Sequence, residues 1–305
     1  MVTRMGSRVQ AFAAAAVLAT GGGVAVSSCG SDEGNGRVDV AAAAKTTAGK
    51  GTARMTMSMR MSGLGLPDPI SIKAQGVTAL SEPRARLSID LGPLLTLVGA
   101  PAGEDRDLEM ILDGADVYVR PPRMEELTVP GGKQWVALDL EALAAAAGLP
   151  AAGLGALLSI DPASQLRALK AAKRLEEVGK EEVDGAQTTH LRGSYRLSDL
   201  IAALPEGERD EARRALRALK RVGGEETGID DPVPEDIWVD EDDVTRRMRS
   251  ASKVPAQAGA PAGSIVVSYV LRDFGARLDT GSPPAFDRYD ATEDLEGPVK
   301  ELFGR

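Results

Sequence analysis

The sequence predicts an α+β fold built on an antiparallel sheet, and three observations support this prediction. Apolar and polar residues alternate over many short segments, turn-forming pairs separate these segments, and helical segments gather in the middle of the chain. Alternation with a period of two indicates strands with one buried and one solvated face. Strands and helices do not alternate one by one, as they would in a parallel sheet.

The alternation is clearest between Met55 and Met61, where four methionines share one face and polar side chains occupy the other. The segments 70–76 and 85–91 repeat this pattern, and Asp113-Gly114 is a hairpin-turn pair between strands expected at 108–112 and 117–119. Further strands are expected at 134–138, 175–183, 187–195, 237–240, 244–249 and 265–271. The total is roughly ten strands in two runs.

Helices are expected at 38–47, in short pieces over 139–158, after Asp161-Pro162, near Ser198 and at 206–222. Asp before Pro is a typical helix start. The segment 142–158 is rich in Ala, Leu and Gly. It is interpreted either as a mobile lid or as an irregular helical connection, and the sequence leaves both open.

The N-terminus has the layout of a secretory signal. Arg4 and Arg8 precede an apolar run over 11–26, which contains three glycines and is too short for a stable spanning helix. The run ends Val26-Ser27-Ser28-Cys29 and resembles a bacterial lipobox. The resemblance implies a signal peptide at 1–28, lipid on Cys29 and a tether at 29–37. The alternative is a plain secretory signal with an incidental free cysteine.

Charge and composition limit the partners. The formal net charge is −9, and loss of the signal, which carries two arginines and no acid, makes it more negative. An acidic surface disfavours nucleic acid and gives no attraction to anionic lipid headgroups, so membrane attachment must come from the anchor. Abundant Ala, Gly, Leu and Arg, with the lipobox, indicate an actinobacterium. We expect a monomer.

Ordered fragments across 38–287 resemble a known family. They are Gly114 to Val119, Trp135 to Asp139, Asp161-Pro162, Val178 to His190, Ile237 to Asp240 with Arg246, and Asp273-Phe274-Gly275. In this order behind a lipobox, they resemble the LppX/LprG-type actinobacterial lipoproteins, relatives of the LolA/LolB carriers. The resemblance implies a strongly curved antiparallel half-barrel whose concave face is covered by helices over an apolar cavity. A polar C-terminal tail is expected at 288–305.

Catalytic chemistry is not expected. His190 is the single histidine and lies in a strand context, so it is interpreted as a satisfied or exposed strand residue. With Cys29 acylated, neither a His/Cys zinc site nor Cys–His catalysis is available. The acidic loop at 230–236, taken with the acidic turn at 240–243, lacks EF-hand spacing and is interpreted as solvated rather than calcium-binding. We expect a protein that is not an enzyme and has no metal or cofactor.

The methionine face is the main candidate site, because methionine is flexible and polarizable and can repack around varied cargo. The proposed cavity lining is Met55, Met57, Met59, Met61, Ile70, Ile72, Leu87, Ile89, Leu154 and Leu157. The hypothesis is a lipoprotein, anchored on the extracytoplasmic face of the cell membrane, that binds or transfers lipid or lipoglycan. The alternative is an envelope protein-interaction or sensor module whose half-barrel is filled by its own side chains, including these methionines.

Overall fold

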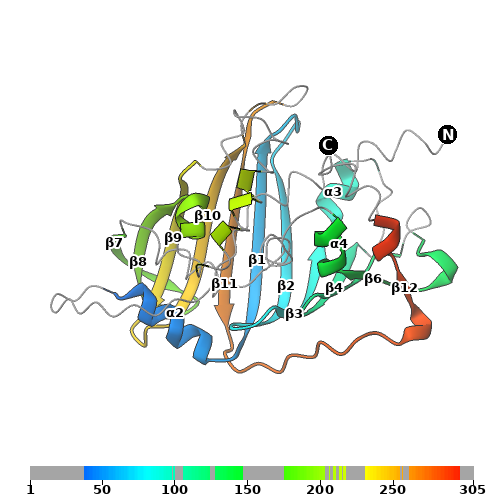
Figure 1. Ribbon diagram of the computed structural model, residues 1–305. Helices are drawn as coiled ribbons and strands as arrows, with labels where there is room; N and C mark the ends of the chain where they lie inside the picture. The colour runs from blue at the N-terminus through cyan, green and yellow to red at the C-terminus, as the bar shows by residue number, and fades with distance from the viewer. Residues whose placement is uncertain are drawn as a thin grey trace.

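The computed structural model describes residues 38–97, 99, 106–123, 128–146, 175–202, 206, 209–210, 213–214, 216–217, 231–254, 256 and 261–295. Within this part, the chain forms one open, curved sheet of twelve strands (Figure 1). This confirms the curved, mostly antiparallel sheet that the sequence analysis expected. The signal peptide, Cys29, the tether, Leu154, Leu157 and the helix expected after Asp161 lie outside the described residues.

The two runs of strands meet in the middle of the sheet, where the first strand pairs with the eleventh. The sheet order is β12-β6-β5-β4-β3-β2-β1-β11-β10-β9-β8-β7, and every neighbouring pair is antiparallel except β12 and β6. The strands are β1 Thr52–Gly63, β2 Ile70–Ala79, β3 Arg84–Asp90, β4 Asp107–Asp113, β5 Asp116–Arg120, β6 Trp135–Asp139, β7 Glu176–Val183, β8 Ala186–Tyr195, β9 Val233–Asp240, β10 Thr245–Val254, β11 Gly263–Arg272 and β12 Arg288–Asp290.

Tight turns set the register of the hairpins. Asp184 and Gly185 join β7 to β8 with φ values of 51° and 80°. Positive φ at both central residues is the geometry of the turn whose twist matches antiparallel strands, and Asp-Gly adopts it readily. Because register decides which face each side chain occupies, the turns keep the apolar residues of neighbouring strands on one side.

The described helices lie on one side of the sheet. They are α2 Val40–Gly49, α3 Gly92–Leu97, α4 Leu140–Ala146 and α7 Leu197–Ala202, with short 3₁₀ turns η2 Pro130–Gly132 and η4 Ala285–Asp287. Figure 1 shows α3 and α4 over the half of the sheet that contains β2 to β6, and α2 on the other half, where it contacts β10. They contact parts of the sheet only, and most of the segments expected to cover the rest lie outside the described residues.

One polar contact fixes α2 to the sheet. The register of β10 against β9 shifts between Thr245 and Arg247, which is a β-bulge. The backbone N–H of Thr245 donates to Oγ1 of Thr47 at 2.9 Å, and that hydroxyl donates to the carbonyl of Ala43 at 2.7 Å. Thr47 is fully buried, so it satisfies a backbone donor that the bulge would otherwise leave without a partner.

The structure adds elements that the sequence analysis did not expect. Helix α3 follows β3, and residues 288–290, placed in the polar tail, form β12 beside β6. Strand β9 begins at Val233, so Glu235 and Asp236 belong to the sheet. The interpretation of these two residues as a solvated loop was wrong, because they are 1% and 5% exposed. Among the described residues, no helix has the length and hydrophobicity needed to span a membrane.

Candidate functional site

One face of the sheet is apolar from β6 to β8, and the methionine strand β1 lies at its centre. On this face, which we call the apolar face, Met57 lies opposite Tyr269 of β11 and Ala74 of β2. Met61 in turn lies between Ile265 and Ile70. Side chains of α2, α3 and α4 join the same apolar cluster. The side chains that alternate with these point to the opposite side, which we call the polar face.

The structure brings together all eight predicted lining residues that it describes. Five of them are buried, and the other three are partly buried and pack against the same cluster. The buried ones are Met55, Met57, Met61, Ile70 and Leu87, and the partly buried ones are Met59, Ile72 and Ile89. The remaining two, Leu154 and Leu157, lie outside the described residues.

Two more methionines extend the apolar face, and the sequence analysis did not single them out. Met110 of β4 lies opposite Leu87, and Met248 of β10 lies opposite both Tyr269 and Ile237. Strand alternation could have identified both, since each follows the period of its own strand. The face therefore carries six methionines, whose thioethers adapt to irregular apolar shapes more readily than branched side chains do.

A single carboxylic acid interrupts the described apolar face. Glu235 lies on β9, opposite Gly193 of β8 and Ser250 of β10, and it is 1% exposed. Neither of its carboxylate oxygens has a hydrogen-bond partner. Burial raises the pKa of Glu235 to about 8, with a further contribution from the neighbouring charge of Asp236. The carboxyl is therefore protonated at neutral pH.

His190 lies on the polar face and is fully satisfied. Its Nδ1 is 2.9 Å from Oε1 of Glu181, and its Nε2 is 2.8 Å from Oδ1 of Asp236. The ring stacks on Trp238 with centroids 4.3 Å apart. Trp238 itself donates to Oε2 of Glu181 at 2.9 Å. The sequence left open whether His190 is a satisfied or an exposed strand residue, and the structure shows it satisfied and buried.

The carboxylate of Asp236 joins three strands on the polar face. It accepts from Arg192 at 2.7 Å and from Arg249 at 3.1 Å, in addition to its contact with His190. Burial alone would raise its pKa, but the hydrogen bonds from Arg192 and His190 hold the pKa of Asp236 below its usual value. These groups are paired with one another across β8, β9 and β10, which gives them a structural role.

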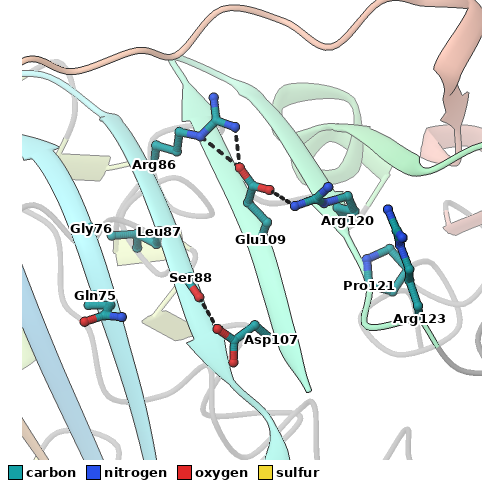
Figure 2. Close-up of a pocket in the computed structure, with 10 residues that line it drawn as sticks. All are labelled: Gln75, Gly76, Arg86, Leu87, Ser88, Asp107, Glu109, Arg120, Pro121 and Arg123. Carbon is teal, nitrogen blue, oxygen red and sulfur yellow. Dashed lines mark hydrogen bonds and ion pairs between the residues drawn. The ribbon is translucent and has the colours of Figure 1, made fainter. Parts of the chain in front are cut away.

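The polar face also contains a groove of about 470 Å³ over β2 to β5 (Figure 2). Within it, Arg86 and Arg120 both donate to Glu109, and Ser88 donates to Asp107 at 2.7 Å. Its lining consists of Gln75, Gly76, Arg86, Leu87, Ser88, Asp107, Glu109, Arg120, Pro121 and Arg123. This groove is polar, and Arg86 and Arg120 within it both donate to the same carboxylate, that of Glu109. It is therefore not the apolar cavity that the sequence predicted.

Comparison with known proteins gives similarities of fold. No family model matches the chain. Solved structures with a similar fold include LprF from Mycobacterium bovis, with 11% identity, a TM-score of 0.38 and coverage of 81% of this chain and 95% of that one. They also include the lipoprotein LppX from Mycobacterium tuberculosis, with 13% identity, a TM-score of 0.39 and coverage of 79% and 98%.

A LolA superfamily protein from Nitrosomonas europaea is similar with 9% identity, a TM-score of 0.27 and coverage of 81% of this chain and 96% of that one. A curated relative, an uncharacterized 31.2 kDa protein of Streptomyces griseus, is 24% identical over 167 residues. The match covers 54% of this chain, and the chain spans about half the length of that relative, 51%. The solved structures include the lipoprotein group that the sequence fragments resemble.

Proposed function

We propose that this protein is a lipoprotein anchored through Cys29 to the extracytoplasmic face of the membrane. Its apolar face holds the acyl chains of a lipid or lipoglycan, for storage or transfer within the cell envelope. The action is physical binding rather than catalysis. Neither a nucleic acid nor a cofactor takes part in it.

The observation that carries this proposal is the sidedness of the sheet. The apolar face runs across β1, β2, β3 and β11 without a charged residue and carries four methionines there, with two more on β4 and β10. Each acyl methylene that moves from water onto such a surface contributes about 0.8 kcal/mol. A single long acyl chain therefore supplies enough free energy for tight binding, provided that the interior opens to admit it.

The anchor explains how an acidic protein works at a membrane. The chain has a formal net charge of −9, which gives no attraction to anionic headgroups. Two or more acyl chains on Cys29 provide stable attachment, and the segment up to Arg37 separates the anchor from Val38, where the described fold begins.

Lipid extraction tests the proposal. A chain beginning at Ser31 keeps every residue of the described fold and lacks the anchor. We expect this chain, purified from a bacterial host without detergent, to yield acyl lipid on organic extraction, at a stoichiometry near one per protein by mass spectrometry. Recovery of a folded protein with no lipid, which also binds none from added vesicles, would contradict the proposal.

The alternative is an envelope protein-interaction or sensor module whose interior is filled by its own side chains. One observation favours it: Met55, Leu87 and Leu271 are at most 1% exposed, so protein atoms already shield them from water. This alternative predicts a specific protein adduct when cells are crosslinked, together with an extract free of lipid. The same purified chain therefore separates the two functions.

A further inference from the structure

Glu235 is placed where a sheet core normally has an aliphatic side chain. The next residue of β9 on the same face is Ile237, which lies opposite Leu191 and Met248. Both oxygens of the Glu235 carboxyl are buried and have no hydrogen-bond partner. Native proteins rarely leave a buried polar group unsatisfied, so this carboxyl requires an explanation beyond packing.

The residues that lie opposite Glu235 on the two neighbouring strands, Gly193 and Ser250, are uncharged. Ser250 lies directly opposite on β10, and the charge of Glu235 acts on Tyr195, at the end of β8. Burial, with a smaller contribution from Glu235, raises the pKa of Tyr195, so its hydroxyl is also uncharged at neutral pH. No ion pair found among the described residues involves Glu235. The site is a small polar island on an apolar surface.

The chemistry of the carboxyl limits what it can bind. Because burial keeps it protonated at neutral pH, it offers one O–H donor and one carbonyl acceptor. A hydroxyl group satisfies both, since it accepts from the first and donates to the second. A protonated amine would bring a charge next to this neutral carboxyl, and burying that charge costs desolvation energy. Among the described residues, no group of acidic or histidine side chains is arranged to hold a metal ion.

We propose that Glu235 binds a hydroxyl group of an acylated lipid whose chains lie along the apolar face. This inference rests on the proposed lipid-binding function and adds the specificity that an apolar surface alone cannot supply. An apolar site discriminates weakly between lipids, whereas a site that hydrogen-bonds a hydroxyl rejects the analogue that lacks it. Glu235 is therefore the residue that distinguishes one acyl lipid from another.

Two probe lipids that differ by one oxygen test the inference. They are 1,2-dipalmitoylglycerol, which has a free hydroxyl, and 1,2-dipalmitoyl-propanediol, which lacks it. Native mass spectrometry of the full-length chain, released from detergent micelles containing either probe, measures the bound fraction. We expect the wild-type protein to prefer the hydroxyl lipid by about tenfold, the effect of one hydrogen bond in a dry site.

Three variants assign the preference to the carboxyl. Glu235→Gln keeps a donor and an acceptor and should keep the preference. Glu235→Met is similar in length but apolar, and should bind both probes equally while unfolding at the same or a higher temperature. Glu182→Met, at an exposed position of β7, is the matched control and should behave as the wild type.

Each other result overturns the inference. Equal binding of both probes by the wild type refutes the role of Glu235 and leaves lipid binding intact, whereas binding of neither probe refutes the proposed function as well. Loss of the preference in Glu235→Gln, with the fold retained, shows that the carboxyl does not act as a donor and acceptor. A lower unfolding temperature of Glu235→Met, or its failure to fold, shows that the carboxyl serves the fold instead.

Discussion

Raising the pH is expected to destabilise this protein through Glu235. The folded-state pKa of this carboxyl is about 8, against 4.5 for an ordinary glutamate. Between these values the unfolded chain has released the proton while the folded chain still holds it. The folded state therefore binds more protons, and the free energy of unfolding falls as the pH rises through this window. The effect is absent below the lower value.

The magnitude follows from the shift. Each pH unit within the window removes about 1.4 kcal/mol, so the loss is about 3 kcal/mol at pH 7. That is a large part of the 5–15 kcal/mol typical of a folded domain. Ser250, which lies opposite Glu235, does not titrate in this range, and burial raises the pKa of Tyr195 above its ordinary value, so Tyr195 stays uncharged as well. On the polar face, Asp236 has a lowered pKa and stays ionised throughout.

Urea unfolding between pH 5 and pH 8 measures this effect. We compare the wild type with Glu235→Gln, which cannot ionise, and with Glu182→Gln as an exposed control. The wild type and Glu235→Gln should have similar stability at pH 5, and the variant should become progressively more stable than the wild type toward pH 8. Parallel profiles for these two proteins would refute the assignment of a buried, protonated Glu235.

Three further predictions concern the anchor and the sheet. Cys29→Ala should move the protein from the membrane fraction to the soluble fraction or block its processing, and unchanged membrane retention would count against the anchor. Gly76→Ala should lower the free energy of unfolding by at least about 1–3 kcal/mol, because the added Cβ would lie 2.0 Å from a backbone oxygen. Gly49→Ala is the control and should leave stability unchanged, because a Cβ added there has no atom within 4 Å. Thr47→Val should lower the free energy of unfolding by about 1–3 kcal/mol, because it leaves the N–H of Thr245 unsatisfied. Thr47→Ser keeps the accepting hydroxyl, so it should lower the free energy of unfolding by less. Equal stability of the Val variant and the wild type would contradict this role.

Local sequence information was enough to predict most of the sheet. Alternation in 55–61 identifies the strand and shows that its methionines share one face, because successive side chains in a strand point to opposite faces of the sheet. The pairs Asp113-Gly114 and Asp184-Gly185 mark two hairpins, since a turn is specified by its own residues. Eight lining residues were placed on one face for the same reason.

Long-range contacts could not be predicted in this way. The partners of His190 come from Glu181, nine residues earlier, and Asp236, 46 residues later, and only the sheet order brings them together. The parallel pairing of β12 with β6 joins segments 153 residues apart, and no local pattern specifies it.

Glu235 was misread for a related reason. Two prolines and several acids nearby are typical of a loop, and burial by the neighbouring strands overrides that local preference. The local composition around Glu235 is therefore typical of a solvent-exposed residue, although the side chain is buried.

If the apolar face holds lipid, a bulky side chain placed on that face should displace the lipid. Met59 is partly buried on the apolar face, and Arg60, the next residue of β1, is exposed on the other side. Lipid recovered per protein is measured by mass spectrometry for the wild type, Met59→Trp and Arg60→Trp. We predict that Met59→Trp loses most of its bound lipid while remaining folded, and that Arg60→Trp retains it. Equal lipid content in a folded Met59→Trp, or a loss in Arg60→Trp alone, would show that the apolar face does not hold the lipid.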